Sequence, residues 1–471
     1  MSSIFGALIE PVELIRPSEL GPVHFIAIGG AGMSGVAALY AELGIEVSGS
    51  DQADSPVLAD LAARGIRVHV GHAAEQLGRA GTIVVSSAIR ADNPELVEAR
   101  ARGLRVWHRS AALGALMLGR PGVSVTGTHG KTTTSGMLAH LLTECGADPG
   151  YVIGAALATS GTSFRLGSGP FVVEADESDG SFRQYPADIA VITNVEADHL
   201  DNWGTPAAYL DGFRAFAAEA RHVVAHLDDP GVRAVLGDRS AEDAGWITFG
   251  EEEGARVRID GIEQVGFRAR ARLGGEPLEL AVPGRFNVGN AAAAVLAAHA
   301  LGVDLQSALA AIKTFRGTAR RFTPVGTVDE VDVVDDYAHH PTEVAATLEA
   351  ARDGVEGRGG RVIACFQPHL FSRTRDFADE FGAALALADE VVLMDIYPAR
   401  EDPIPGVTSD LLVTSCAAHG RTAHLVSDRT AVPRAVADLA QPGDVVLTLG
   451  AGDVTRVGPQ IVEELRARSR R

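Results

Sequence analysis

The sequence predicts an α/β protein of three domains: a Rossmann-like N-terminal domain, a central P-loop ATPase domain with a mostly parallel sheet, and a Rossmann-like C-terminal α/β domain. Three observations indicate this. A strand leads into a G-x-G-x-x-G loop near residue 30, another strand ends in Gly-Lys-Thr near residue 130, and strands alternate with helices after about residue 316. Such alternation is typical of parallel sheets. We expect domains at 1–120, 121–318 and 319–471.

Composition is that of an ordinary globular protein. The 471 residues suffice for two to four domains, and 46% of them are hydrophobic and 22% charged. The formal net charge of −20 argues against nucleic acid or an anionic membrane as a partner. Binding of a small anionic substrate would therefore require local positive charge or hydrogen-bond donors from loop N–H groups, arginine and metal.

Nothing in the sequence predicts export or a membrane span. The first residues have no basic segment ahead of an apolar core, and the alanine-rich run 291–303 is too short to cross a bilayer. Cys145, Cys365 and Cys416 lack the spacing of metal or disulfide sites. We therefore expect a cytoplasmic protein in a reducing compartment.

The N-terminal domain begins with a dinucleotide-fold fingerprint. An apolar strand at 23–28 leads into the glycine-rich loop 30–35, which opens a helix, and a second strand at 45–48 leads to Asp51. In this fold a diphosphate lies on the helix N-terminus and the acidic residue lies near a ribose. The geometry suits any nucleotide diphosphate, so NAD is one option among several. The binding residues expected from the loop and its acidic partner are Gly30, Gly32, Ser34, Gly35 and Asp51.

Further strand–helix units follow, with strands expected at 67–70, 82–86 and 104–107. Ser86 and Ser87 close one of these strands at the edge where ligands bind in such sheets. Contact with a ligand and a plain turn both fit these serines. The first domain should end near residues 120–122.

The central domain opens with an apolar β-branched strand, the loop GTHGKT at 127–132, and a helix to about Cys145. Glycines let backbone N–H groups face phosphate oxygens, Lys131 supplies a point charge and Thr132 offers a hydroxyl to Mg²⁺. The loop is two residues shorter than G-x-x-x-x-G-K-[ST]. Any strand-to-helix turn can carry glycines, but strand, Gly-Lys-Thr and helix occur here together. Lysine occurs only at positions 131 and 313, which suggests that the loop needs a compact ammonium.

Two later strands of this domain run into carboxylates. The apolar segment 171–173 leads to Glu174 and further acids up to residue 179, and the segment 189–195 leads to acids and His199. In a parallel sheet these strand ends lie beside the phosphate loop, where Mg²⁺ needs hard oxygen ligands. Two such runs make an ordinary exposed loop a poor explanation.

The remaining segments complete the domain pattern. Alternating residues from 246 to 283 predict short antiparallel strands with one wet face, and residues 284–290 enter an alanine-rich helix. The arginines of the alternating region fit a solvated face better than a nucleic-acid patch. In the third domain we expect strands at 331–335, 361–366, 390–396 and 444–449, with helices that include 342–351 and 459–466.

Together these motifs closely resemble those of the Mur ligases, the ATP-dependent amide-forming enzymes of peptidoglycan precursor assembly. The resemblance covers essentially the whole chain. The segments that resemble the family's phosphate loop, metal and phosphate strands, and adenine-contacting segment are 127–134, 174–179, 194–199 and 286–291. Residues 335–343, with 30–35, resemble the branch that joins UDP-N-acetylmuramate to L-alanine.

The resemblance implies roles for the candidate residues. The implied catalytic residues are Lys131, Glu174, His199 and Arg321. The implied ATP-binding residues are Gly127, Thr128, Gly130, Lys131, Thr132, Thr133, Asn290, Arg321 and Asp336. The implied ligands of Mg²⁺, with Mn²⁺ also possible, are Thr132, Glu174 and His199. The UDP-sugar would contact the fingerprint residues and Ser86, and the amino acid would contact His339, His369 and Arg373. His199 could instead be a hydrogen-bonded strand-end histidine, and Asn290 could instead cap its helix.

The implied reaction has two steps. The muramyl carboxylate attacks the γ-phosphate of ATP to give an acyl phosphate and ADP, and the amine of L-alanine then displaces phosphate to form the amide. Since two anions meet in line, positioning and charge neutralisation should dominate. The partners expected are UDP-N-acetylmuramate, L-alanine and ATP, with no nucleic acid and no membrane; a monomer and a homodimer are both open.

Two departures from the family pattern stand out. Several members carry a carbamylated lysine after the histidine motif, but no lysine occurs between Leu200 and Arg221. Where some relatives read Gln-Pro-His-Arg, this chain has Leu370 in the last position. Three other functions remain to be separated by assay: a recycling ligase that adds a tripeptide to the same sugar nucleotide, a P-loop ATPase switch with interaction domains, and a dehydrogenase.

Overall fold

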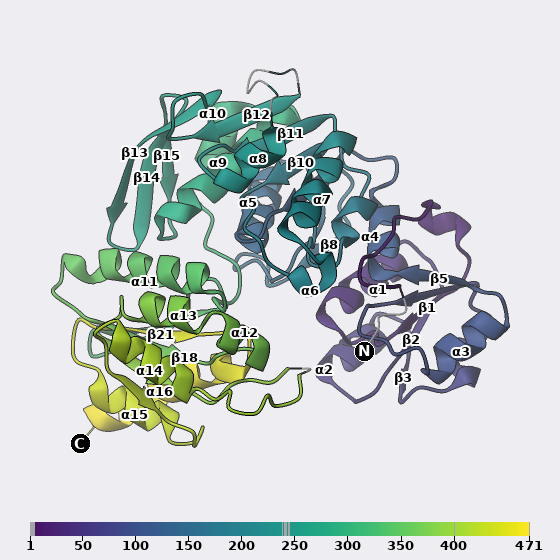
Figure 1. Ribbon diagram of the computed structural model, residues 1–471. Coiled ribbons are helices and arrows are strands. Elements are labelled where there is room, and N and C mark those ends of the chain that lie inside the picture. The colour runs from purple at the N-terminus through teal and green to yellow at the C-terminus, as the bar shows by residue number, and fades with distance from the viewer. Residues whose placement is uncertain (1–4, 238, 240–242, 244, 400, 471) are drawn as a thin grey trace. The chain divides into compact units, whose positions relative to one another are not determined.

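The computed structural model describes residues 5–237, 239, 243, 245–399 and 401–470 (Figure 1). Residues 1–4, which begin the N-terminal segment with no predicted signal peptide, lie outside the described part. The chain divides into two compact units. The first comprises Met1–Ile259, Leu273–Gly275 and Gly289–Ile312, and the second comprises Asp260–Arg272, Glu276–Val288 and Lys313–Arg471.

The first unit begins with a five-stranded parallel sheet in the order β3-β2-β1-β4-β5. β2 and β3 follow on one side of β1, whereas β4 and β5 follow on its other side, so the strand order switches between β1 and β4. Doubly wound sheets bind their ligands at such a switch point. Its strands are β1 (Val23–Ile26), β2 (Val47–Asp51), β3 (Arg67–Val70), β4 (Thr82–Val85) and β5 (Arg105–His108). Its helices are α1 (Ala31–Glu42), α2 (Pro56–Ala63), α3 (Pro94–Ala101) and α4 (Arg109–Met117).

Local sequence explains why these helices start where they do. Ser55 and Asn93 cap α2 and α3 by accepting hydrogen bonds from first-turn amides, and a proline follows each cap. Proline suits this position because its fixed φ is helical and its missing N–H is not needed. β1 and β4 are buried along their whole length, as expected of central parallel strands. The predicted Rossmann-like N-terminal domain is confirmed, with strand ends shifted by up to three residues.

A ten-stranded sheet follows, in the order β15-β14-β13-β12-β11-β10-β6-β9-β7-β8. β6, the strand of the phosphate loop, lies between β9 and β10 and is parallel to both. The strands are β6 (Gly122–Thr126), β7 (Gly150–Val152), β8 (Phe164–Arg165), β9 (Phe171–Glu174), β10 (Ile189–Ile192), β11 (His222–His226), β12 (Trp246–Gly250), β13 (Val257–Val265), β14 (Arg268–Leu273) and β15 (Glu276–Leu280). The helices are α5 (Lys131–Glu144), α6 (Leu200–Trp203), α7 (Pro206–Glu219), α8 (Pro230–Leu236), α9 (Arg285–Ala300) and α10 (Leu305–Ile312).

One expectation about this sheet is wrong in part. β12, the first strand of the alternating region, is parallel to β11 and to β13, whereas the sequence predicts antiparallel strands from residue 246 onward. Burial alternates strictly along β14, so the predicted wet face is present there. Alternation reports which face is buried and not the direction of the neighbouring strand, which explains the error.

The second unit is built on a six-stranded sheet in the order β16-β17-β21-β18-β19-β20. Only β16, which the sequence does not predict, runs antiparallel to its neighbour. The strands are β16 (Thr323–Val328), β17 (Val331–Asp336), β18 (Val362–Phe366), β19 (Glu390–Leu393), β20 (Ala423–Leu425) and β21 (Val445–Leu449). The helices are α11 (Pro341–Glu356), α12 (Phe371–Asp376), α13 (Ala378–Leu385), α14 (Asp410–Ala418), α15 (Val432–Leu439) and α16 (Val457–Ser469).

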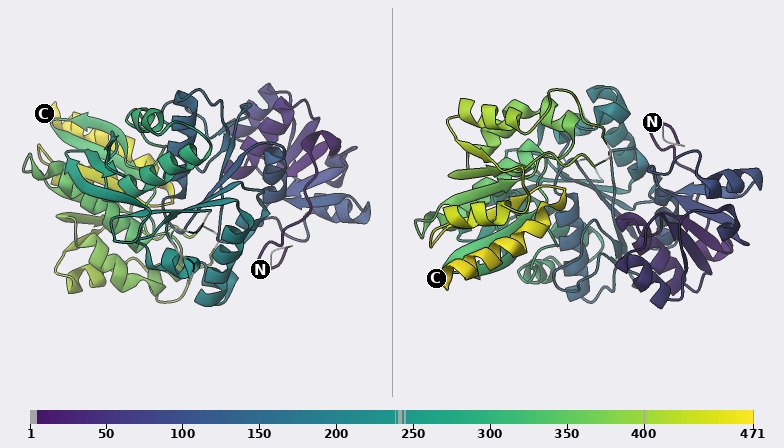
Figure 2. Two further views of the ribbon diagram at one scale, coloured as in Figure 1. Left: turned by 90° about the horizontal axis from the view of Figure 1, so that it is seen from above. Right: turned by 90° about the horizontal axis from the view of Figure 1, so that it is seen from below.

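Helices cover both faces of this sheet. Alternate residues of β18 point to opposite faces: Val362, Ala364 and Phe366 pack with α11, α13 and α14, while Ile363 and Cys365 pack with α15 and α16. Figure 2 shows the yellow C-terminal helices on one side of the green strands and the lighter green helices on the other. A strand buried on both faces is apolar throughout, and the continuous apolar run of β18 is therefore what predicts this strand from the sequence.

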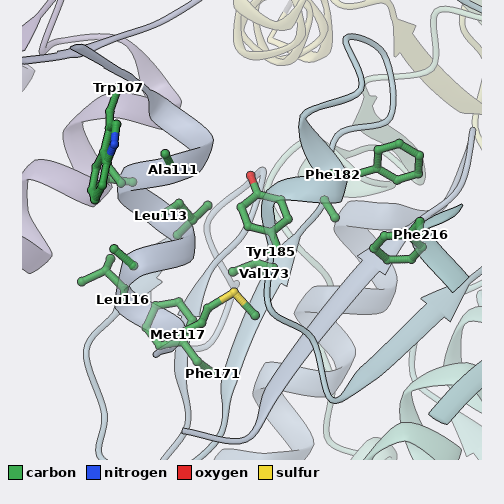
Figure 3. Packing of buried hydrophobic residues seen from close by; sticks show 14 of the residues in the cluster. Trp107, Ala111, Leu113, Leu116, Met117, Phe171, Val173, Phe182, Tyr185 and Phe216 are labelled. Carbon is green, nitrogen blue, oxygen red and sulfur yellow. The ribbon is translucent and has the colours of Figure 1, made fainter. Parts of the chain in front are cut away.

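The two sheets of the first unit share one apolar core. The cluster contains Trp107, Leu113 and Met117 from β5 and α4 together with Phe171 and Tyr185 from the central domain. Figure 3 shows side chains of α4 facing Phe171, Val173 and Tyr185. Each fully buried large apolar side chain contributes roughly 1.5–3 kcal/mol, so α4 is held firmly between the two sheets.

Candidate active site

The phosphate loop joins β6 to α5. Gly127 and Gly130 have φ angles of 135° and 83°, which side-chain-bearing residues rarely adopt. A Cβ at Gly127 would collide with Thr193 Oγ1, and one at Gly130 would lie 2.6 Å from Asn290 Oδ1. Both the backbone and the available space therefore require glycine at the two positions.

Lys131 folds back over this loop. Its ammonium donates to the carbonyl oxygens of Gly127 (2.7 Å) and Thr128 (3.0 Å) and lies 2.8 Å from Glu177 Oε2. Burial lowers the pKa of Lys131, but the carboxylates of Glu177 and Asp176 raise it by more, so the pKa ends above its usual value. The side chain therefore stays a cation next to the glycine loop.

Glu177 is the carboxylate opposite this lysine. Its side chain is 1% exposed. Burial raises its pKa, Lys131 lowers it and Asp176 raises it again, with a result of about 7 against an ordinary value of 4.5. A buried carboxyl that titrates near neutrality is a feature that the acidic run in the sequence did not single out.

Glu177 should make the stability of the protein depend on pH. Since its folded pKa lies above its unfolded value, this carboxyl stabilises the folded state fully below about pH 4.5, and this contribution is lost as pH rises through about 7. We expect the free energy of unfolding to fall by roughly 1–3 kcal/mol more in the wild type than in Glu177→Gln between pH 5 and pH 8. Urea unfolding at four pH values measures this, with Glu144→Gln, an exposed glutamate, as control. Parallel curves for Glu177→Gln and wild type would contradict the assignment.

Thr132 in the first turn of α5 and Glu174 at the end of β9 bring two possible oxygen ligands for a metal ion together. Thr132 Oγ1 donates to Glu174 Oε1 at 2.9 Å, and the amide of Gly154 donates to Glu174 Oε2 at 2.7 Å. A hydroxyl and a carboxylate beside a phosphate loop are hard ligands of the kind Mg²⁺ takes. The two side chains therefore fit the predicted metal site.

The segment after β10 supports the other side of the loop. Asn194 Oδ1 accepts from the amide of His129 at 2.8 Å, and its Nδ2 donates to the carbonyl of His129 at 2.9 Å. Thr128 Oγ1 donates to the carbonyl of Glu196 at 2.9 Å. His129 Nε2 lies 3.0 Å from Glu196 Oε2. These contacts fix the loop, and the sequence predicted neither His129 nor Asn194 in this supporting role.

His199 lies at the N-cap of α6 with a φ of 53°. Its ring is 3.5 Å from Asp198 Oδ2. α6 is attached to the acidic loop after β9, because Asn202 Nδ2 donates to Ser178 O and Trp203 Nε1 donates to Glu177 O. These contacts hold α6, which follows His199, beside the acidic loop, while the role of His199 as a metal ligand stays a prediction.

Two further predicted residues lie at this loop. Asn290 is inside α9, five residues after its start, so the alternative that it caps the helix is wrong. Its side chain instead contacts Gly130, although the two are far apart in sequence. Thr133 is buried in the first turn of α5. The structure therefore brings the first-unit residues predicted for ATP to one place.

The glycine-rich loop of the N-terminal sheet forms a second cluster. Gly30 caps α1, and the carboxylate of Asp51 accepts a hydrogen bond from the amide of Gly29 at 2.9 Å. A Cβ at Gly35 would lie 3.0 Å from the ring of Phe164 in β8, so this glycine permits close packing. Ser34 is in the first turn of α1, and Ser86 is in the turn after β4, where its carbonyl accepts from the Ile89 amide.

Sequence reasoning missed a connection between the two clusters. Ser87 Oγ donates to Asp179 Oδ2 at 3.0 Å and lies 3.1 Å from His108 Nε2. Burial lowers the pKa of His108 to about 4, partly offset by Asp179, so the ring is neutral near pH 7. The sequence left Ser87 open between a ligand contact and a plain turn, and it did not single out His108.

The second unit gathers the residues predicted for the amino acid. His339 and His369 have ring centroids 5.9 Å apart, and His339 Nδ1 lies 3.1 Å from Glu343 Oε2. Arg321 is 3.8 Å from Glu343 Oε1 and 5.1 Å from the ring centre of Tyr337. Glu343 therefore holds both His339 and Arg321, a role the sequence did not indicate.

Asp336 and Arg373 complete that group. Asp336 accepts from the amides of Phe322 (2.7 Å) and Ala338 (2.8 Å), and burial raises its pKa to about 6 while Arg321 lowers it. Arg373 lies in the last turn of α12, just beyond Leu370, which has a φ of 72°. The predicted functions of these residues toward ATP and the amino acid stay predictions.

The phosphate loop, its partly buried lysine and its oxygen ligands define a P-loop nucleotide-binding protein. Three family models match successive segments: "Mur ligase family, catalytic domain" at residues 22–121, "Mur ligase middle domain" at 125–298 and "Mur ligase, glutamate ligase domain" at 320–452. The chain belongs to the Mur ligase family.

Individual relatives agree with this assignment. The chain is 60% identical to the UDP-N-acetylmuramate–L-alanine ligase of Cutibacterium acnes, covering 98% of this chain and 100% of the relative. It is 52% identical to the ligase of the same name from Thermobifida fusca, again over 98% and 100%. The crystal structure of UDP-N-acetylmuramate-alanine ligase MurC from Thermotoga maritima matches with a TM-score of 0.79, 30% identity and coverage of 96% and 100%.

A murein peptide ligase from Psychrobacter arcticus shares the fold, with a TM-score of 0.66, 24% identity and coverage of 94% and 98%. The predicted three-domain α/β architecture is therefore confirmed. No helix among the described residues is both long enough and apolar enough to span a bilayer.

Proposed function

We propose that this protein is an ATP-dependent ligase that joins the carboxylate of UDP-N-acetylmuramate to the amine of L-alanine, in the synthesis of peptidoglycan precursors. The observation that carries the proposal is Lys131, a partly buried ammonium that donates to carbonyls of the glycine loop, next to the Thr132–Glu174 oxygen pair. This is the machinery of phosphoryl transfer, and the full-length relatives carry the ligase name.

The residues of the chain have separate tasks in this reaction. Gly127, Gly130 and the first amides of α5 bind phosphate oxygens, and Lys131 neutralises the charge that builds up as the sugar carboxylate attacks the γ-phosphorus. The acyl phosphate so formed is attacked by the amine of L-alanine, and phosphate leaves as the amide forms. Asn290, whose side chain lies against Gly130, would face the nucleotide.

Thr132 and Glu174 would hold Mg²⁺, with His199 as a further ligand of a second ion. When bound, the metal supplies positive charge to phosphate oxygens. The UDP-sugar would contact Gly30, Gly32, Ser34, Asp51 and Ser86 at the N-terminal sheet. His339, His369 and Arg373 would serve the amino acid, with Arg321 and Asp336 serving ATP.

The domain limits proposed from the sequence, 1–120, 121–318 and 319–471, assign one substrate to each segment. The first family match ends at residue 121 and the third begins at residue 320, next to two of these limits, whereas the middle match ends at residue 298. ATP and a nucleotide sugar are both cytoplasmic metabolites, so we propose that the reaction takes place in the cytoplasm.

The amino-acid preference tests the proposed function. We expect L-alanine to be used best, glycine and L-serine to react at reduced kcat/KM, and D-alanine and tripeptide to fail. A pocket for one methyl group discriminates by only about 1–3 kcal/mol against one atom more or less, whereas the D-isomer exchanges methyl and carboxylate. Phosphate release with UDP-N-acetylmuramate, ATP and Mg²⁺ measures the series.

The alternatives give different outcomes in the same assay. Preference for the tripeptide would indicate the recycling ligase. Phosphate release that needs neither the sugar nucleotide nor an amino acid would indicate an ATPase switch. Preference for D-glutamate or L-glutamate would leave the ligase chemistry intact but assign another branch.

A further inference from the structure

Arg109 lies over the glycine-rich loop of the N-terminal sheet. A Cβ added at Gly32 would meet three atoms of the Arg109 side chain, of which Nη1 is the nearest. Gly32 is the middle glycine of the fingerprint, the one whose missing side chain lets a diphosphate approach the backbone. The guanidinium therefore lies where such folds bind diphosphate.

The Arg109 guanidinium is half-buried and unpaired. Among residues 5–237, 239, 243, 245–399 and 401–470 it makes no hydrogen bond and no ion pair. Other arginines of the same domain are paired: Arg64 lies 2.9 Å from Asp60, and Arg79 contacts Glu46. An unpaired half-buried arginine with fixed planar donors is suited to an anionic ligand.

The position of Arg109 is determined by the elements around it. It begins α4, whose N-cap His108 accepts from the Ser110 amide, and α4 is packed into the core shared by the two sheets (Figure 3). His108 and Ser87 connect this helix start to Asp179 of the acidic loop. The guanidinium is thus carried by a rigid element and not by a mobile loop.

The surrounding backbone offers further donors for the same anion. The amides of Ala31 and Gly32 at the start of α1 make no hydrogen bond with the described residues, as expected for a helix N-terminus. Asp51, the nearest acidic residue of the loop, is engaged by the amide of Gly29. On the other side, Arg109 helps Lys131 and Ser178 to lower the pKa of Asp176 against the effect of burial.

We propose that Arg109 binds the diphosphate of the UDP-sugar, together with the first amides of α1. The proposal rests on the proposed function for the identity of the ligand. A charge-assisted contact of this kind is stronger than a neutral hydrogen bond, and arginine can contact two phosphate oxygens at once. With the diphosphate bound, Arg109 would lie between the sugar-nucleotide loop and the acidic loop, where its charge also lowers the pKa of Asp176.

Binding measurements by calorimetry test the proposal. UDP-N-acetylmuramate and UDP are each titrated into wild type, Arg109→Ala, Arg109→Lys and Arg79→Ala; UDP keeps the diphosphate but lacks the sugar and its carboxylate. We expect Arg109→Ala to weaken both ligands roughly 10- to 100-fold, Arg109→Lys to be intermediate, and Arg79→Ala to bind as wild type does. ATP affinity within about twofold of wild type shows that the variants are folded.

A second variant approaches the same site from the backbone. Gly32→Ala places a Cβ against the Arg109 side chain and should weaken UDP as well. Unchanged affinity of Arg109→Ala for both ligands would overturn the proposal, and so would a loss for UDP-N-acetylmuramate alone, which would assign Arg109 to the sugar carboxylate. If wild type binds UDP, Arg109→Ala weakens it, and no amide is formed with any amino acid, the proposed function fails while the role of Arg109 stands.

Discussion

Replacing Lys131 with methionine is expected to reduce kcat at least roughly hundredfold while the protein stays folded. One cation that neutralises the transferring phosphoryl group supplies several kcal/mol, and about 3 kcal/mol corresponds to a hundredfold in rate. Lys131 is 16% exposed, donates to two loop carbonyls and lies beside Glu177. Steady-state phosphate release with all three substrates measures the loss.

The chain contains a matched control for this variant. Lys313 is the only other lysine, is 43% exposed and pairs with exposed Glu279, so Lys313→Met should keep wild-type kcat. Removing Lys131 leaves Glu177 buried without its cation, but the loss of Lys131 also raises the pKa of this carboxyl further, so it can take up a proton instead. Lys131→Met should thus lose stability mainly above neutral pH, and Lys131→Met with Glu177→Gln should regain it. Activity of Lys131→Met within a few-fold of wild type would refute the phosphate-loop assignment.

The second large effect is expected for Glu174→Gln. This change should raise the Mg²⁺ concentration needed for half-maximal activity at least roughly tenfold, since an amide is a weaker ligand of a hard cation than a carboxylate. Affinity for the UDP-sugar should stay within about twofold, because the hydrogen bonds of Glu174 are with Thr132 and Gly154 of the central domain, and the UDP-sugar is proposed to bind at the N-terminal sheet. Metal titrations at saturating substrates, with calorimetry for the sugar nucleotide, measure the two quantities.

Glu144→Gln, an exposed glutamate at the end of α5, provides the comparison. It should change neither the metal requirement nor the sugar affinity. If Glu174→Gln impaired Mg²⁺ dependence and UDP-sugar affinity to the same extent, Glu174 would instead support the structure through the Gly154 amide.

Motifs local in sequence were the predictable part of the site. The residues of the phosphate loop lie close together in sequence, between Gly127 and Thr132. Their chemistry follows from a strand, a glycine loop and a helix start in immediate succession. Apolar runs located the central strands for the same reason, since a strand covered on both faces must be apolar throughout.

Contacts between distant segments were not predictable in this way. Arg109 lies against Gly32 only because α4 packs into a core formed by two sheets, and no spacing in the sequence reports that. The contacts of fully buried Glu95 were equally unpredictable. This carboxylate of α3 lies 3.2 Å from His24 in β1 and 3.0 Å from His72 in the loop after β3. The approach of Asn290 to Gly130 was reached through resemblance and not through the residues themselves.

The core shared by the first two sheets has a thermodynamic consequence. Unfolding either sheet alone would expose the apolar faces of α4 and Phe171 to water, so the two sheets should melt in a single cooperative transition. A ligand that binds only the folded form adds a stabilisation set by its concentration relative to Kd, about 2.7 kcal/mol at a hundredfold excess over Kd. If the sugar nucleotide and ATP bind at these two sheets as proposed, each ligand would therefore also protect the site of the other.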